Sequence, residues 1–143
     1  MRLGLEGKSI MVAAASRGLG NGIARAVAGD GARVSIAAPT EPKVHEAAAA
    51  LREETGAEVI SSPFDARDPE SIQAWRDRTV EAFGTVDGLV VNAGGPPPGQ
   101  FDDFDDDDWQ AAFELTLMSS VRMIRAVLPA MRAQGFGSIL TVT

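Results

Sequence analysis

The residues best suited to bind a ligand are glycines that follow the first apolar segment of the chain. Residues 9–13 form a short, mostly apolar run, and Gly18 and Gly20 come shortly after it, ahead of a segment with helical spacing over residues 23–28. Because glycine has no Cβ, the backbone at such positions can approach an anion closely. The free N–H groups and the dipole of the following helix attract negative charge. The pattern predicts a phosphate or diphosphate site; the alternative is an ordinary tight turn.

Segments that alternate between strand and helix must position this turn. Gly22, one helical turn further on, is expected to let the helix pack closely on the sheet. Strands joined by right-handed helical crossovers form a parallel sheet covered on both faces. We therefore predict an α/β fold with a doubly wound parallel sheet. The predicted strands are 9–13, 33–38, 58–62, 88–92 and 138–143, and the predicted helices are 23–28, 40–55, 68–83 and 106–134.

Two further motifs accompany the glycine turn at the same edge of the predicted sheet. Asp65 follows the third strand, and Asn92-Ala93-Gly94 ends the fourth. With these motifs the whole chain resembles the short-chain dehydrogenases/reductases, whose cofactor turn reads TGxxxGxG. Gly18 and Gly20 match that pattern, whereas Ala13 and Ala14 replace its Thr and first Gly. Within the family, the first turn and residues 126–131 look most like the 3-oxoacyl-carrier-protein reductases.

The resemblance implies a Rossmann-like sheet with strand order 3-2-1-4-5. It also implies an oxidoreductase that transfers hydride between a nicotinamide cofactor and a carbonyl compound or secondary alcohol. Asp65 stands where the family binds the adenine amino group, and the Asn-Ala-Gly motif borders the cofactor. The expected cofactor contacts are Ala14, Ser16, Arg17, Gly18, Leu19, Gly20, Ala38, Asp65, Ala66, Asn92, Ala93 and Gly94.

The end of the second strand and the glycine turn favour NADP(H) over NAD(H). NAD-binding members usually carry a carboxylate there for the ribose 2′-OH, but the expected position falls near Ala38, and Glu41 lies further on. Arg17 directly precedes Gly18, and an arginine can bind a 2′-phosphate through two parallel hydrogen bonds. The alternative for Arg17 is a solvated charge on a turn.

The catalytic residues of the family are expected to be absent from these 143 residues. The family uses a Ser, a Tyr and a Lys; the sequence contains no tyrosine, and the Ser would follow the fifth strand. Thr116 replaces an Asn that often holds a proton-relay water. We expect residues 1–143 to form one incomplete dinucleotide-binding domain, truncated before the last strands. The alternative is a non-catalytic module that binds nucleotide or packs against a partner.

Charge and composition exclude several other classes. The net charge of −7 disfavours nucleic acid and anionic membranes. The chain has no cysteine and one histidine, His45, which is expected on the surface, so no metal site is predicted. The acidic residues between 102 and 108 are interpreted as the start of a helix rather than a calcium site. Residues 1–8 lack the apolar run of a signal peptide, no segment could span a membrane, and a cytoplasmic location is expected.

The long helix 106–134 carries an apolar stripe that includes Met123, Val127 and Met131. We expect this stripe to serve both the core and a homo-oligomer interface, because family members often pair through this helix. Ser119 and Ser120, in the same helix, lack a histidine partner and are interpreted as packing residues rather than nucleophiles.

Overall fold

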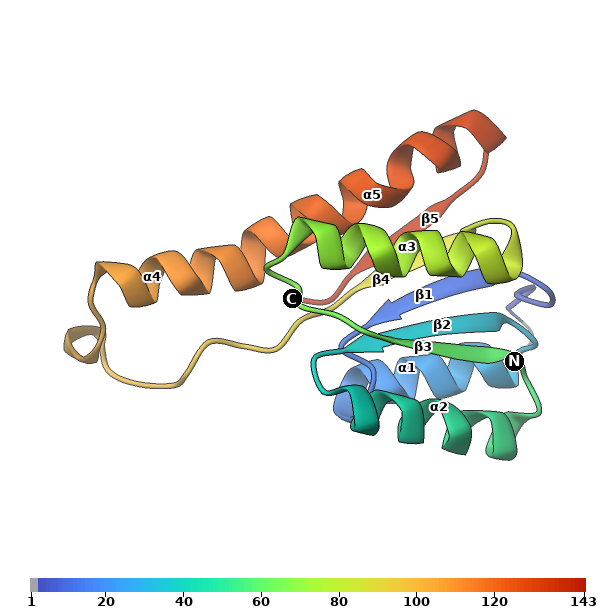
Figure 1. Ribbon diagram of the computed structural model, residues 1–143, viewed down its shortest axis with the longest axis horizontal. Helices are drawn as coiled ribbons and strands as arrows, with labels where there is room; N and C mark the ends of the chain where they lie inside the picture. The colour runs from blue at the N-terminus through green and yellow to red at the C-terminus, as the bar shows by residue number, and fades with distance from the viewer. Residues whose placement is uncertain (1–2) are drawn as a thin grey trace.

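Five parallel strands form one sheet in the order β3-β2-β1-β4-β5, as predicted. The computed structural model describes residues 3–143. Residues 1 and 2, which the sequence analysis included in the domain, lie outside the described residues. Each strand is joined to the next through helical segments (Figure 1). The elements are β1 (Ser9–Ala13), α1 (Gly18–Gly29), β2 (Arg33–Ala38), α2 (Glu41–Thr55), β3 (Val59–Pro63), α3 (Pro69–Phe83), β4 (Gly88–Val91), a 3₁₀ turn (Phe101–Asp103), α4 (Asp106–Phe113), a π-helical segment (Glu114–Met118), α5 (Ser119–Gln134) and β5 (Ser138–Thr141).

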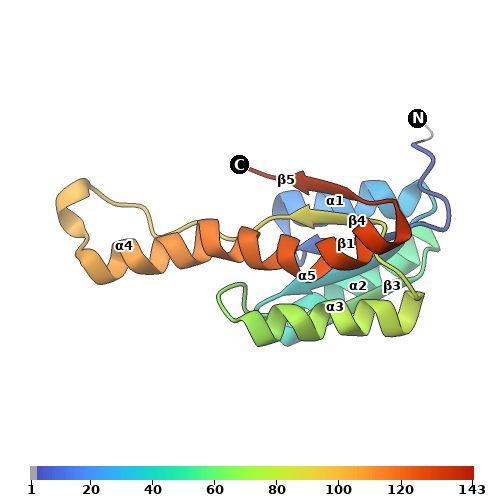
Figure 2. The ribbon, with the colours of Figure 1, turned by 90° about the horizontal axis from the view of Figure 1, so that it is seen from above.

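The sheet separates two apolar cores, because successive side chains of a strand point to opposite faces. On β1, Val12 belongs to the core under α1 and α2, whereas Met11 belongs to the core under α3 and α5. Figures 1 and 2 show these helix pairs on the two faces of the sheet. Every residue of β1 is buried, which explains why four of its five residues are apolar.

The helix ends follow the local signals in the sequence. The Asp68 carboxylate caps α3 by accepting a hydrogen bond from the Glu70 N–H. The glycines predicted to stop α2, α3 and the long helix are all in the left-handed conformation: Gly56, Gly84 and Gly135. The start of α1 differs, because the helix begins at Gly18 rather than at residue 23. Its first turn contains glycines, which local propensity disfavours in a helix, and packing against the sheet overrides that preference.

The predicted long helix is continuous but changes its winding midway. Between α4 and α5, Glu114–Met118 form a π-helical segment, and α4 projects beyond the sheet (Figures 1 and 2). The Thr116 and Ser120 hydroxyls donate to the carbonyls of Ala112 and Thr116, and Ser119 bonds to the Leu115 carbonyl. Both serine hydroxyls are thus bonded to the backbone of their own helix.

Carboxylates of the acidic stretch, residues 102–108, form capping hydrogen bonds at helix N-termini, as expected of residues that start a helix. Asp105 and Asp108 exchange side-chain to backbone hydrogen bonds at the start of α4. Gln100 and Asp103 form a similar box around the preceding 3₁₀ turn. No cluster of three metal-ligating side chains occurs among residues 3–143. In the same part of the chain, no helix is both long and apolar enough to cross a bilayer.

Candidate functional site: the edge of the sheet at the β1–α1 turn

The turn between β1 and α1 lies where the sheet order reverses. The chain leaves β1 to form β2 on one side, and later returns to form β4 on the other side of β1. In open α/β sheets, the crevice at this point, outside the carboxyl ends of the strands, is where ligands bind. The first turn of α1 begins there, so its free backbone N–H groups face the crevice.

Gly20 is the glycine that the turn requires. A Cβ at Gly20 would collide with the Ala14 carbonyl oxygen, lie 2.9 Å from the Ala14 carbonyl carbon and lie 3.0 Å from the Asn92 Nδ2. The prediction that Gly22 allows close packing of the helix on the sheet is wrong, because a Cβ there would meet no atom within 4 Å. Gly22 is exposed, and the close approach between α1 and the β1–α1 turn occurs at Gly20 instead.

Ala14 adopts the backbone conformation for which the family's turn uses glycine. Its φ is +52°, and among the described non-glycine residues it alone has a positive φ. Neighbouring bonds hold this turn: the Asn92 Nδ2 donates to the Ala13 carbonyl at 3.4 Å, and the Asn21 Nδ2 donates to the Ala15 carbonyl at 3.1 Å. The alanine that replaces the family's glycine at this position therefore keeps the shape of the turn, but its left-handed backbone conformation is strained.

Replacing Ala14 with glycine should therefore stabilise the fold. Relief of the left-handed conformation outweighs the additional freedom of glycine in the unfolded chain, and we expect a gain of about 1 kcal/mol in the free energy of unfolding. Urea denaturation measures this change. The matched control is Ala49→Gly on the exposed face of α2, which should lose a similar amount. A loss of stability in Ala14→Gly would contradict the strain at this position.

A hollow of about 610 Å³ opens beside the turn and gathers residues from separate loops. Five of the predicted contacts line it: Ala14, Asp65, Ala66, Ala93 and Gly94. The sequence reasoning missed Leu115 of the long helix and the apolar pair Pro63 and Phe64, which also line it. Phe64 directly precedes Asp65, so its place beside the motif was the available signal.

The remaining predicted contacts lie outside the lining of this hollow. Its lining residues do not include Ser16, Arg17, Gly18, Leu19, Gly20, Ala38 or Asn92. Thr116, at the position of the family's water-holding Asn, is not among them either. Ala38 is fully buried at the end of β2, whereas Leu19 is 62% exposed at the start of α1. Thr116 is exposed and its hydroxyl already donates to Ala112.

Arg17 is the cation nearest to the start of α1 in the sequence. It occupies the N-cap position of α1 in an extended conformation and is exposed. Within residues 3–143 its side chain has no hydrogen bond or ion pair, so its guanidinium is available to a ligand. The first carboxylate along the chain after β2 is Glu41, which pairs with His45 at 3.3 Å. His45 is exposed, as expected, and also bonds to the Ser61 hydroxyl at 2.7 Å.

Asp65 is held by its neighbour Arg67. The Arg67 Nε and Nη2 donate to the two carboxylate oxygens at 3.1 Å each, and the Arg67 backbone N–H donates at 2.9 Å. The guanidinium hydrogen bonds, followed by the backbone bond, lower the pKa of Asp65 below its ordinary value of 3.8. The carboxylate is therefore ionised and fixed at the rim of the hollow, as an acceptor for a donor group.

Acid should weaken the fold partly through Asp65. Because its pKa is lower in the folded chain than in the unfolded chain, Asp65 adds stability above the unfolded value and loses it as pH falls through the folded value. We expect the difference in free energy of unfolding between the wild type and Asp65→Asn to shrink between about pH 5 and about pH 3. Urea denaturation at both pH values measures it, with Asp102→Asn on the exposed 3₁₀ turn as the control. If the stability difference between the wild type and Asp65→Asn were the same at both pH values, the hydrogen bonds between Asp65 and Arg67 would not stabilise the folded chain.

A reversed sheet order with a glycine turn at its centre defines a doubly wound α/β domain of the Rossmann kind. The sequence model of the short chain dehydrogenases matches residues 8–143. The chain belongs to the short-chain dehydrogenase/reductase family of oxidoreductases.

Named relatives agree with this assignment. The chain is 34% identical to the 3-oxoacyl-[acyl-carrier-protein] reductase FabG of Escherichia coli over 98% of its own length and 56% of the relative. It is 30% identical to the ketoacyl reductase HetN of a Nostoc species, over 96% of the chain and 48% of the relative. The solved L-sorbose reductase of Gluconobacter frateurii, complexed with NADPH and L-sorbose, matches with a TM-score of 0.93 and 35% identity, over 99% of the chain and 54% of the reductase. The chain thus spans about half the length of the curated relatives it matches.

Proposed function

We propose that this chain is the dinucleotide-binding part of an NADP(H)-dependent oxidoreductase that reduces carbonyl compounds or oxidises secondary alcohols. The observation that carries the proposal is the β1–α1 turn, where Gly20 packs on the Ala14 carbonyl and the first turn of α1 faces the crevice. That turn leaves space and N–H donors for a diphosphate. The solved sorbose reductase, which contains NADPH, supports the choice of ligand.

The residues present suit such a cofactor, whose nicotinamide would carry the hydride. Backbone N–H groups at Gly18 to Gly20 would bind the diphosphate, and the fixed Asp65 carboxylate would accept a hydrogen bond from the adenine amino group. Ala66, Ala93 and Gly94 would line the adenosine side of the hollow. The unpaired Arg17 and the apolar, carboxylate-free end of β2 at Ala38 favour a 2′-phosphate over a bare 2′-OH.

The 143 residues by themselves are proposed to bind the dinucleotide without turnover. The sequence contains no tyrosine, so it lacks the phenol that the family uses as its general acid. The Thr116 hydroxyl, committed to the Ala112 carbonyl, replaces the family's water-holding Asn. The bonded Thr116 hydroxyl also favours the second candidate function, a nucleotide-binding module without catalysis.

Fluorescence titration of this chain with NADPH and NADH tests the proposal. We expect saturable binding of both, with NADPH at least tenfold tighter, and no oxidation of NADPH in the presence of a ketone. Absence of binding would refute the dinucleotide site, and a preference for NADH would refute the assignment of NADP(H). Turnover by this chain would refute the proposed lack of a general acid.

We also propose that the complete protein pairs with a second copy through the long helix 106–134. The predicted stripe residues Met123, Val127 and Met131 are buried in the core of this chain, so the interface would use another face of the helix. Three large apolar side chains, Trp109, Phe113 and Leu117, recur every four residues along α4 and the π segment and are 46–53% exposed. This spacing puts them on one face of the helix, and such a patch is costly to leave in water.

Sedimentation velocity tests the pairing with Phe113→Asp, which places a charge at the middle of that face. We expect this variant to sediment as a monomer where the wild type sediments as an oligomer. The control, Ala49→Asp on exposed α2, should leave the oligomer unchanged. A monomeric wild type would refute the interface.

A further inference from the structure

Arg122, on α5, joins two segments that lie far apart in the sequence. Its Nη1 atom donates to the Glu114 carboxylate at 2.7 Å and to the Arg67 backbone carbonyl at 3.1 Å. Glu114 begins the π-helical segment, whereas Arg67 belongs to the loop between β3 and α3. A single nitrogen atom of Arg122 therefore ties the long helix to this loop.

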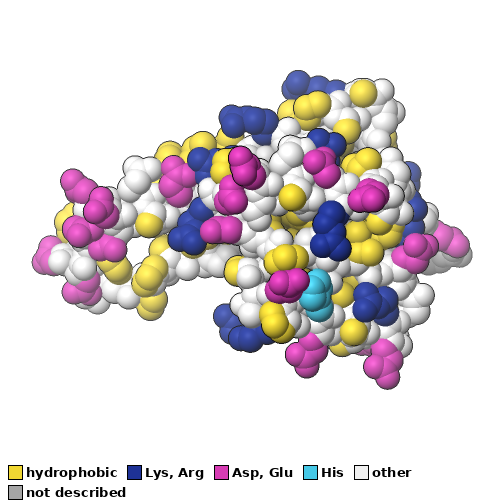
Figure 3. Space-filling view, in the orientation of Figure 1, with side chains coloured by type: hydrophobic (Ala, Val, Ile, Leu, Met, Phe, Trp, Pro, Cys, Tyr) yellow, Lys and Arg dark blue, Asp and Glu magenta, His cyan; other side chains and the backbone are white. Residues whose placement is uncertain are grey.

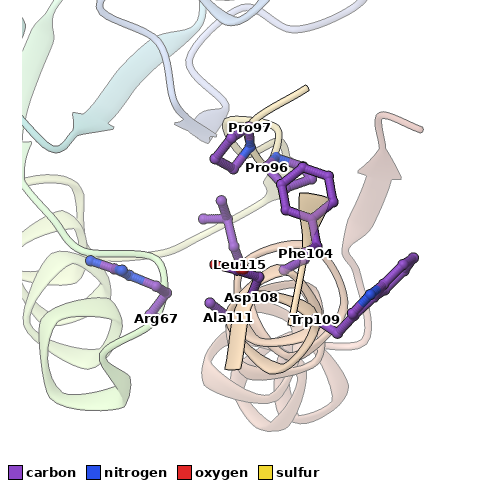
Figure 4. A pocket seen from close by; sticks show the side chains of 9 residues that line it. Arg67, Pro96, Pro97, Phe104, Asp108, Trp109, Ala111 and Leu115 are labelled. Atoms are coloured by element: carbon purple, nitrogen blue, oxygen red, sulfur yellow. The ribbon is translucent and has the colours of Figure 1, made fainter. Parts of the chain in front are cut away.

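The two segments joined by Arg122 form two walls of the dinucleotide hollow. Asp65 and Arg67 line the hollow from the loop, and Leu115, which directly follows Glu114, lines it from the long helix. Figure 4 shows Arg67 and Leu115 on these two segments. The same two residues also line a second cavity, of about 360 Å³, against α4. The bonds of Arg122 therefore fix the position of one wall relative to the other.

The outer end of the loop is where Arg122 holds it. The inner end is tied to α3, because the Asp65 N–H donates to the Ser71 hydroxyl at 2.9 Å. Arg67 is exposed, and its guanidinium reaches back to both oxygens of the Asp65 carboxylate. A shift of the Arg67 backbone would therefore move the donors that orient this carboxylate. Among residues 3–143, Arg122 makes the hydrogen bond that links this loop to the long helix.

The ion pair between Arg122 and Glu114 is shielded enough to act as an anchor. Their side chains are 20% and 32% exposed, and the Glu114 carboxylate also accepts from the Gln110 Nε2 at 3.3 Å. Figure 3 shows acidic and basic side chains side by side where the start of α3 lies next to the long helix. A partly buried, charge-assisted hydrogen bond keeps its geometry better than an exposed surface pair. π-helical turns within α-helices are also frequent at functional sites.

We propose that Arg122 is a positioning residue of the adenine site, which holds the Asp65 carboxylate and the Leu115 wall in the places where they recognise the adenine ring. This inference rests on the proposed function, in which Asp65 accepts a hydrogen bond from the adenine amino group. A hydrogen bond to a charged group is worth about 10- to 100-fold in affinity. NADPH and NADH carry the same adenine, so Arg122 acts on both equally, unlike Arg17.

Fluorescence titration of Arg122→Met tests the proposal with NADPH, NADH and the hypoxanthine analogue of NADPH, in which a carbonyl oxygen replaces the adenine amino group. We expect the affinities for NADPH and NADH to fall by equal factors of about 10-fold. The hypoxanthine analogue lacks that amino donor, so its affinity should change by less than about twofold. Arg125→Met, on the exposed side of α5, should leave all three affinities unchanged.

The dependence on the purine separates positioning from a general loss of structure. An equal loss for all three dinucleotides would overturn the proposal, because a distorted fold does not distinguish adenine from hypoxanthine. A loss for NADPH alone would overturn it too, since it would assign Arg122 to the 2′-phosphate. If urea denaturation shows that Arg122→Met does not fold, Glu114→Ala decides instead, because alanine favours the helix. Glu114→Ala frees the Arg122 guanidinium and should weaken NADPH and NADH binding in the same adenine-dependent way.

The wild type distinguishes failure of this inference from failure of the proposed function. If the wild-type chain binds none of the three dinucleotides, the dinucleotide site itself is refuted. If the wild type binds NADPH and Arg122→Met binds it as tightly, only the positioning role of Arg122 is refuted.

Discussion

Replacing Gly20 with alanine is expected to abolish measurable NADPH binding and to destabilise the fold. The added Cβ would collide with the Ala14 carbonyl oxygen and lie 2.9 Å from its carbon. Both atoms belong to the backbone, so a rotamer change cannot relieve the clash. Either α1 moves away from the sheet or the strained turn at Ala14 opens. Both changes displace the N–H groups proposed to bind the diphosphate.

The stability cost of this overpacking is about 1–3 kcal/mol. Fluorescence titration with NADPH and urea denaturation measure the two effects. Gly22→Ala is the matched control, since its Cβ meets nothing within 4 Å. Alanine is also the better helix former, by about 1 kcal/mol. We expect this control to bind NADPH normally and to be slightly more stable. Normal NADPH affinity in Gly20→Ala would show that the turn is not where the dinucleotide binds.

Replacing Arg17 with methionine is expected to lower the affinity for NADPH by about 10- to 100-fold while leaving NADH binding unchanged. The guanidinium has no partner within residues 3–143, so binding a phosphate breaks no existing ion pair. A charge-assisted hydrogen bond is worth about 1.5–3 kcal/mol, which gives this range. Methionine keeps the length of the side chain and removes only its donors and charge.

Titration of both dinucleotides against the variant separates the 2′-phosphate from the rest of the cofactor. Arg25→Met is the control, because Arg25 lies on the same helix but pairs with Glu54 at 2.8 Å. It should change neither affinity by more than about twofold. An equal loss for NADPH and NADH in Arg17→Met would assign Arg17 to the diphosphate instead, and no loss at all would make it a solvated turn charge. High salt should reduce the effect, because the site is exposed.

Local patterns in the sequence were sufficient to predict the order and type of the elements. Apolar runs such as residues 9–13 indicate buried strands, and capping residues such as Asp68 and Gly84 mark helix ends, because these signals act within a few residues. The order of the strands was predicted from the resemblance to the family, because right-handed crossovers alone allow several orders. The two boundaries that differ most, the start of α1 and the π segment, are places where packing overrides local preference.

The sequence by itself determined the fold, the family and the location of the glycine turn. Only the tertiary structure decided which glycine the turn needs, because the clash at Gly20 comes from Ala14 and Asn92, which lie in other elements. It also decided that Arg67 holds Asp65, and that Leu115 and Arg67 form a wall shared by two cavities. The spacing of residues along the chain indicates helical or strand periodicity and the residues that cap helices. Contacts between residues of different loops depend on how those loops meet at the edge of the sheet.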